Sequence, residues 1–212
     1  MSREDISTVG LGKNRIESLT DGIFATVMTV LVLSLSVPVI TSANVSSELV
    51  VDLESLFPNV VSYVISFVVI GVYWVSHHAV FHFVKRTNRQ LIWLNMLFLL
   101  CVGFIPFSAA LIGRYPYQQI TTIIYGANLI GAGMSLYVLF WYSNSNNRLV
   151  SKDQDERLVR LARRRILAGP VIYSIAVLLS FLDPRISLAL YAITPIYYIL
   201  PGKIDVHWSH SN

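Results

Sequence analysis

The chain has 212 residues and a formal net charge of +4; 54% of its residues are hydrophobic and only 13% are charged. Soluble domains carry about 25% charged residues, so this composition excludes a water-soluble fold. A helix needs roughly 20 apolar residues to cross a bilayer, which leaves room for about six spans and little else. We therefore expect residues 1–212 to form a single all-α transmembrane domain.

Six charge-poor runs follow one another along the chain and predict six transmembrane helices. They cover residues 19–40, 58–84, 91–112, 120–142, 166–182 and 186–200. The last two runs are the shortest and are separated only by Asp183, Pro184 and Arg185, so they predict a tight helical hairpin or, alternatively, two half-spans. Residues 1–13 are polar and lack the pattern of a signal peptide, so we expect the first helix to stay in the mature protein.

A carboxylate, Asp21, lies near the start of the first predicted helix. An unpaired charge is costly inside a membrane, although the first turns of a helix favour a negative one. Candidate partners are the nearby Arg15 and the group Trp74, His77 and His78 on the second predicted helix. This pairing predicts a buried structural network or, alternatively, an ion site.

One face of the first predicted helix combines apolar side chains with hydroxyl groups. A rotation of 100° per residue gathers four residues on this face, with two threonines beside them. The face consists of Ile23, Val27, Val30 and Ser34, and its hydroxyl-bearing neighbours are Thr26 and Thr29. Because any apolar helix can show such a stripe, the pattern alone does not distinguish a pore lining from a packing face.

The second predicted helix carries three histidines, His77, His78 and His82. The last two are four residues apart, a spacing that could hold a metal, but neither the glutamate of a zincin helix nor a cluster of cysteines or carboxylates accompanies them. We expect one of these histidines to satisfy a buried polar partner instead. The sequence predicts no metal site, no cofactor and no catalytic pair, and hence no enzyme.

The basic residues are unevenly distributed between the two sides of the predicted membrane domain. Fourteen of the 16 Lys and Arg residues lie in the terminal segments and in the second and fourth connections; the other two are Arg114 and Arg185. Basic residues near helix ends are retained in the cytoplasm, which predicts cytoplasmic N- and C-termini. We expect the dense cluster at residues 157–165 to face anionic head groups of the bilayer. It lacks the aromatic residues of a nucleic-acid site, so we expect no nucleic-acid partner.

Residues 15–25 read Arg-Ile-Glu-Ser-Leu-Thr-Asp-Gly-Ile-Phe-Ala. This segment resembles the signature Arg-x-x-x-Phe-Ser-Asp-x-x-x-Ala of the transmembrane protein 175 family, the endosomal and lysosomal potassium channels and their bacterial homologues. Leu19 and Thr20 replace the Phe and Ser of the signature. Residues 73–78 and 93–107 also resemble bacterial members. The residues of the expected structural network are Arg15, Thr20, Asp21, Trp74, His77, His78 and Asn95.

The resemblance implies a homotetramer of six-helix subunits around a central pore that is lined by the first helix. It also implies that potassium and other monovalent cations permeate past a hydrophobic constriction. The Thr-Val-Gly-Tyr-Gly filter of ordinary potassium channels is absent from the sequence. The family's ring-forming position, and a threonine three residues later, correspond to Thr26 and Thr29, so a hydroxyl stands where a bulky apolar residue is usual. The sequence does not decide whether Ile23, Val27 or Val30 forms the narrowest ring of the pore.

Two alternatives remain at this point, a secondary transporter and a proton-permeable membrane protein. A transporter of this size would show inverted repeats, broken helices and a charged midplane site. The sequence displays no such repeat, and its predicted midplane is poor in charge. The single six-helix repeat suggests a bacterial inner membrane as the location.

Overall fold

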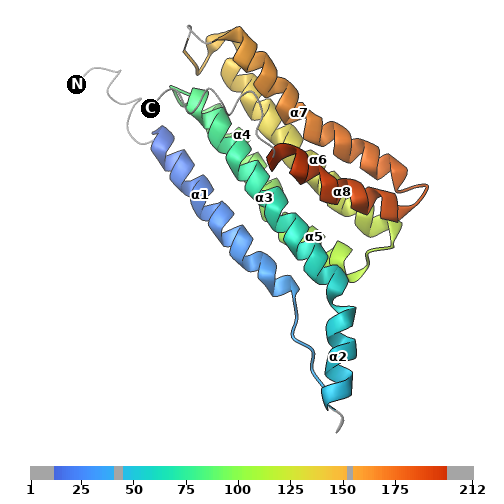
Figure 1. Ribbon diagram of the computed structural model, residues 1–212. Coiled ribbons are helices and arrows are strands. Elements are labelled where there is room, and N and C mark those ends of the chain that lie inside the picture. Colours follow the sequence, from blue (N-terminus) through green and yellow to red (C-terminus); the bar gives the residue numbers. More distant parts are fainter. Residues whose placement is uncertain (1–11, 41–44, 152–154, 200–212) are drawn as a thin grey trace.

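Figure 1 shows the computed structural model, which describes residues 12–40, 45–151 and 155–199. Residue 200 of the sixth predicted run, and the basic residues Arg3, Lys152 and Lys203, lie outside the described residues. The described chain is all-helical. Its α-helices are α1 (Lys13–Val30), α2 (Val45–Ser55), α3 (Phe57–Phe83), α4 (Arg89–Gly103), α5 (Ile105–Arg114), α6 (Gln119–Asn144), α7 (Glu156–Leu179) and α8 (Pro184–Ile199), and its 3-10 helices are η1 (Leu31–Ser34) and η2 (Ser145–Asn147).

The helices form six segments, because α1 continues into η1, α2 into α3, and α4 into α5. Four of these segments are long and apolar enough to cross a membrane, counted over the described residues: 13–34, 48–83, 89–114 and 119–144. The predicted hairpin is present as α7 and α8, and the described part of α8 covers 16 residues, Pro184–Ile199.

The first helix begins and ends earlier than the charge-poor run 19–40. It starts at Lys13, whose amine lies 3.8 Å from the carboxylate of Glu17 one turn later. It ends at Ser34, and Leu35 is extended. Pro38 follows shortly after; it lacks a backbone N–H and restricts the residue before it to extended conformations. The predicted boundary was therefore wrong by about a turn and a half at each end.

Two further predicted runs differ from the observed helices. The outer connection before α3 contains α2, which projects from the end of the bundle (Figure 1). The third run is divided at Phe104, because Pro106 stands in the first turn of α5 and cannot donate a backbone hydrogen bond to the preceding turn.

Helix α7 corresponds to the fifth charge-poor run. It begins at Glu156 and not at Ile166, where that run starts. The carboxylate of Asp155 accepts a hydrogen bond from the backbone N–H of Arg157 and caps the helix. Arg160 and Glu156 form an ion pair of 3.0 Å one turn apart on its exposed side. Charged residues are good helix formers where they face water, so hydropathy alone misses this first part of α7.

The basic connections lie together at one end of the bundle. The backbone N–H groups of Lys85 and Arg86 donate to the carbonyl of Leu149 at 2.8 and 3.1 Å, and Val84 forms a bridge with Val150. The N-terminal end of α1 points to the same end of the molecule in Figure 1, whereas Arg114 and Arg185 lie at the opposite end.

Candidate functional site

Helix α1 lies along one edge of the bundle and has one face turned inward. It packs on α3 and α4, and η1 packs on α5. Its buried residues recur every three or four positions, as expected for one stripe of a helix. They are Ile16, Thr20, Phe24, Val27 and Leu31. This stripe forms the centre of the packing surface of α1, and the half-buried Ile23 and Met28 also pack against the core.

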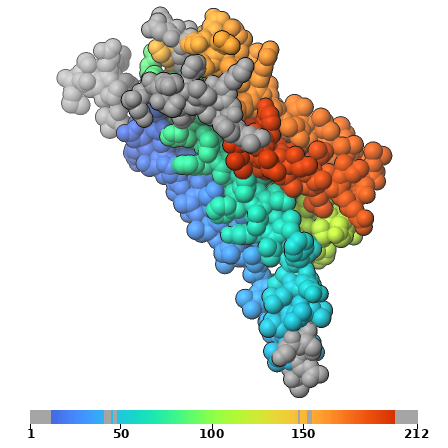
Figure 2. Space-filling view, viewed as in Figure 1, coloured from blue at the N-terminus to red at the C-terminus, as the bar shows by residue number. Residues whose placement is uncertain are grey.

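The opposite face of α1 is exposed, and Figure 2 shows this helix in blue along one edge of the subunit. Gly22, Thr26, Thr29 and Leu33 recur on it at intervals of four, three and four residues and are all exposed. Leu33 is 76% exposed, and Val30 beside the stripe is 42% exposed. An apolar and hydroxyl-bearing helix face that the described part of the subunit leaves exposed is available to line a pore or to contact another subunit.

The two threonine hydroxyls on this face are fixed by their own helix. Thr26 Oγ1 donates to the carbonyl of Gly22 at 2.8 Å. Thr29 Oγ1 lies 2.8 Å from the carbonyl of Thr26 and 3.1 Å from that of Ala25. A hydroxyl has one hydrogen to donate and two lone pairs to accept with. Because the hydrogens are engaged within the helix, these oxygens can act as acceptors for water or a cation on the exposed face.

A buried hydrogen-bonded chain joins α1 to α4 and α3. Asn95 Nδ2 donates to Thr20 Oγ1 at 3.1 Å, and Asn95 Oδ1 lies 2.8 Å from His77 Nε2. Because the Asn95 oxygen is an acceptor, His77 carries its proton on Nε2. The imidazole stacks between Phe81 and Phe98, with centroid distances of 4.3 and 5.5 Å. Thr20, Asn95 and His77 are all buried, so these hydrogen bonds are made away from water.

A second link between α1 and α3 lies one residue further along α1. Trp74 Nε1 donates to Asp21 Oδ1 at 2.8 Å, and the indole stacks on His78 with centroids 6.1 Å apart. Asp21 thus has a hydrogen-bond donor from the second predicted helix, as the sequence suggested. Asp21 and Trp74 are both exposed, whereas the neighbouring chain through Thr20 is buried. The two links together fix the rotation of α1 against α3.

The structure separates the six residues of the expected pore-lining stripe. Thr26, Thr29 and Val30 are exposed, and Ile23 and Ser34 are half-buried. Val27 is only 7% exposed and packs inside its own subunit. Within the subunit, Val27 therefore lies on the packing side of α1. Arg15, from the expected network, is exposed in the first turn of α1.

Sequence reasoning missed Gly22 and Leu33 as members of the exposed face. The stripe was chosen for its apolar residues, and apolar residues at helical spacing are found on the packing face of any helix. Phe24 is a better guide to the buried side of α1, because a large aromatic side chain favours burial. Across the described ranges, no group of three or more His, Cys, Asp or Glu side chains is placed to hold a metal ion.

Comparison with known proteins gives similarities over most of the chain. A family model described as endosomal/lysosomal potassium channel TMEM175 matches residues 15–106. A potassium channel of Streptomyces collinus is 30% identical over 188 residues, which cover 87% of this chain and 90% of that protein. The human endosomal/lysosomal proton channel TMEM175 is 27% identical over 139 residues, 62% of this chain and 28% of that protein.

A solved structure is similar in fold as well as in sequence. It is the crystal structure of a TMEM175 homologue from Chamaesiphon minutus, described as a lysosomal potassium-selective channel homologue. It superposes with a TM-score of 0.78 at 29% identity and covers 89% of this chain and 96% of its own. The similarity therefore extends well beyond residues 15–106, the segment matched by the family model.

Proposed function

The chain belongs to the TMEM175 family, and from that premise we propose that it is a potassium-permeable cation channel. The bacterial relative with 30% identity is named a potassium channel, and the family model carries the same description. The observation that carries the proposal is the exposed face of α1, which combines threonine oxygens with apolar side chains. The permeant ion is potassium, and no cofactor takes part.

The proposed pore is formed by four copies of α1 in a homotetramer. One subunit offers a single suitable helix face, so a closed ring of subunits is needed to surround a pathway. We assign the pore to Gly22, Thr26, Thr29 and Leu33, with Val30 at its flank. This assignment keeps Thr26, Thr29 and Val30 from the sequence-based stripe and moves Val27 to the packing side.

Ion selection in this pore would differ from that of channels with a carbonyl filter. Four copies of Leu33, with Val30 beside it, would form an apolar ring, and apolar constrictions restrict ions by dewetting. Four copies of Thr26 and of Thr29 would supply oxygen acceptors at neighbouring levels. The threonine oxygens would replace part of the hydration shell before an ion reaches the apolar ring.

The two polar links would keep the pore face in register. Thr20 and Asp21 lie on the same turn of α1 as Gly22, and both are bonded to other helices of the subunit. Rotation of α1 about its axis would break these bonds and turn Phe24 or Val27 toward the pore. We therefore assign Thr20, Asp21, Trp74, His77 and Asn95 a positioning role.

The protein is a multi-pass membrane protein with bacterial relatives, and we propose a bacterial inner membrane as its location. The connections at residues 84–89 and 145–151 lie at one end of the bundle; the first carries Lys85, Arg86 and Arg89, and the second carries Arg148. The positive-inside rule assigns this end to the cytoplasm, together with both termini.

Proton permeation is a second candidate, because the vertebrate relative is named a proton channel. Threonine hydroxyls along the α1 face could order water between the apolar rings, which is what proton transfer along a pore requires. Protons and potassium would then share one pathway. The flux measurement distinguishes the two ions directly.

The test is ion flux from liposomes that contain the purified protein, are loaded with potassium and are diluted into sodium with a protonophore present. Protein-dependent flux that disappears without the potassium gradient would establish potassium conduction. A parallel assay without protonophore, with a potassium ionophore and an internal pH dye, reports proton flux. If folded tetramers pass neither ion, the proposal fails, and counterflow with candidate substrates tests the transporter alternative.

A further inference from the structure

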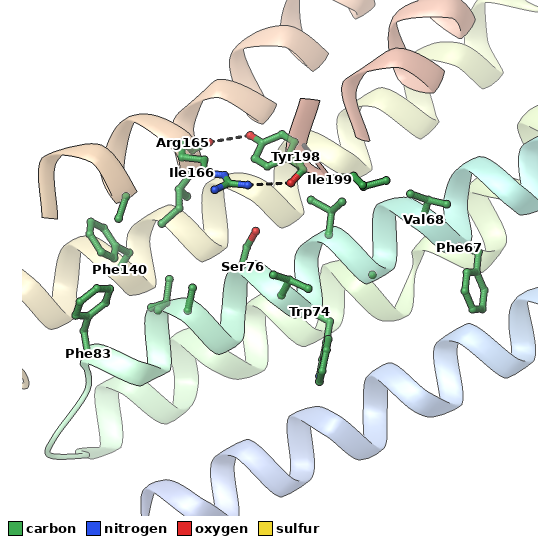
Figure 3. Close-up of a pocket in the computed structure, with 16 residues that line it drawn as sticks. Phe67, Val68, Trp74, Ser76, Phe83, Phe140, Arg165, Ile166, Tyr198 and Ile199 are labelled. Atoms are coloured by element: carbon green, nitrogen blue, oxygen red, sulfur yellow. Dashed lines mark hydrogen bonds between the residues drawn. The ribbon is translucent and has the colours of Figure 1, made fainter. Parts of the chain in front are cut away.

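Polar side chains also join the helices at places away from α1. In the groove drawn in Figure 3, Arg165 Nη2 donates to the carbonyl of Tyr198 at 2.8 Å, and Tyr198 Oη donates to the carbonyl of Arg165 at 2.7 Å. This pair joins α7 to α8. Another such place is the junction of α4 and α5, which the side chain of Asn128 reaches from α6. The second place bears on the pore face, because α5 also packs on η1, the continuation of α1.

The carboxamide of Asn128 is inserted into a broken helical ladder. In an uninterrupted helix, the N–H of Ile105 would donate to the carbonyl of Cys101. The orientation of an amide is assigned from its hydrogen-bond network, and one orientation satisfies both ends of Asn128. In this orientation Asn128 Nδ2 donates to the Cys101 carbonyl at 3.0 Å, and Asn128 Oδ1 accepts from the Ile105 N–H at 3.2 Å. A side chain that enters the ladder in this way is one of the known causes of a sharp kink.

The break between α4 and α5 lies inside an apolar segment. Residues 89–114 are long and apolar enough to cross a membrane, and Phe104 divides them. Pro106 has no backbone N–H, so the turn cannot close as it does in a regular helix. In lipid, a broken helix is tolerated only where neighbouring groups satisfy the backbone atoms that the break frees. Asn128 satisfies a donor and an acceptor of this break with one side chain.

The other end of α5 is held by α3. Ser62 Oγ donates to the carbonyl of Ala109 at 2.7 Å. A Cβ at Gly113 would lie 3.1 Å from the Cα of Asn59, so the two backbones approach closely there. Helix α5 is therefore fixed at two points, on α3 near its C-terminal end and on Asn128 at its first residue.

Helix α5 supports the end of the pore helix. The 3-10 helix η1 packs on α5, and its residue Leu31 is fully buried. Leu33, two residues later, is 76% exposed and forms the proposed apolar ring. A shift of α5 would therefore move η1 and change the position of Leu33.

We propose that Asn128 is a positioning residue of the pore. Its carboxamide holds the break between α4 and α5, and α5 in turn holds η1 with the Leu33 side chain at the pore. The role assigned to Asn128 rests on the proposed function, because it requires Leu33 to face the pore.

Hydrogen–deuterium exchange of the purified full-length protein tests the structural part of this proposal. Asn128→Leu keeps the size of the side chain and removes both hydrogen bonds. Exchange at residues 101–108 should rise about tenfold, and exchange at residues 31–36 should rise with it because η1 rests on α5. The matched control is Asn144→Leu, the same substitution on the same helix, since the Asn144 amide donates to the carbonyl of Phe140 in α6 at 2.8 Å. This control should leave both segments unchanged.

Potassium flux per folded tetramer separates a positioning role from a stabilising one. In Asn128→Leu the flux should fall several-fold, because Leu33 side chains that are free to move pack on one another and the ring dewets. Pro106→Ala in this background restores a backbone N–H and allows Ile105 to bond Cys101 as in a continuous helix. The double variant should regain the melting temperature and the protection of residues 101–108. It should not regain the flux, because a straightened α5 no longer supports η1.

Three results would overturn the proposal. Unchanged exchange at residues 101–108 in Asn128→Leu would show that Asn128 does not hold the break. Raised exchange there, with wild-type exchange at residues 31–36 and wild-type flux, would show that α5 and η1 are not coupled. Recovery of the flux together with the melting temperature in the double variant would leave Asn128 a purely stabilising role.

Two further outcomes are distinguished by the same measurements. If the wild-type protein passes no ion, the proposed function fails, and exchange at the two segments still decides whether Asn128 holds α5 against η1. If Asn128→Leu alone does not fold, the double variant replaces it. Wild-type flux and wild-type exchange at residues 31–36 in the double variant would then overturn the proposal.

Discussion

The two sides of the subunit differ in how closely their helices approach one another. On the α1 side, polar side chains bond across helices, Asn95 to Thr20 and Trp74 to Asp21. On the α6–α8 side, a small residue allows close approach. A Cβ at Gly133 of α6 would lie only 2.6 Å from the ring of Pro170 in α7, so the α6 backbone packs directly against this ring.

This difference indicates how the fold can present a defined face of α1. Helices in a membrane associate through van der Waals packing and interhelical hydrogen bonds, because lipid supplies no hydrophobic driving force between them. Close packing at glycine fixes the distance between α6 and α7. A hydrogen bond from a known position of α1 also fixes its rotation, and rotation decides whether Thr26 or Phe24 is exposed.

The largest loss of stability should come from Gly133→Leu, on the close-packed side. A side chain at this position must displace Pro170, whose ring is rigid, and overpacking costs about 1–3 kcal/mol or more. We expect little folded protein by size-exclusion chromatography and thermal unfolding in detergent. Gly103→Ala is the control, since a Cβ there has nothing within 4 Å. If Gly133→Leu unfolds at the same temperature as the wild-type protein, α6 and α7 are not in close contact.

The next largest effect should come from Asn95→Leu, on the hydrogen-bonded side. The change leaves His77 Nε2–H and the Thr20 hydroxyl buried without their partner, which costs about 1–3 kcal/mol. Thermal unfolding should show this loss, and potassium flux should fall because α1 can rotate.

A double-mutant cycle sharpens this test. Thr20→Val in the Asn95→Leu background removes one of the unpaired groups. The free energy of unfolding of the double variant should therefore fall by less than the sum of the two single decreases. Strict additivity would show that Thr20 and Asn95 do not interact.

The sequence predicted the polar residues of the network better than the rotation of α1. Thr20, Asp21, His77 and Asn95 stand out because polar groups are rare in apolar runs and must find partners there. Hydropathy gives an apolar stripe but not the side that packs, so the pattern alone could not show that Val27 is buried within the subunit.

A smaller effect is expected from Trp74→Phe, which keeps an aromatic ring and removes the Nε1–H that bonds Asp21. Hydrogen bonds between membrane helices contribute about 0.6 kcal/mol on average and up to about 1.7 kcal/mol, and this one is exposed. Thermal unfolding should show that the free energy of unfolding falls by about 0.6 kcal/mol. Trp93→Phe is the matched control, because this indole is 65% exposed on α4. Equal effects of the two changes would mean that the bond to Asp21 contributes nothing.

The smallest change in stability, with the clearest change in flux, is expected from Thr26→Val. The two side chains have nearly the same shape, and Thr26 is exposed in the subunit and bonded only to its own helix among the bonds described above, so the free energy of unfolding should change by less than about 0.5 kcal/mol. If Thr26 faces the pore, four oxygens are replaced by four methyl groups, and the potassium flux should fall several-fold as the ring dewets.

Val27→Ala, one residue further along α1, should give the opposite result. It creates a cavity inside the subunit, lowers the melting temperature and leaves the flux per folded tetramer unchanged. Reduced flux from Val27→Ala at normal stability, with no effect of Thr26→Val, would turn the pore to the other face of α1.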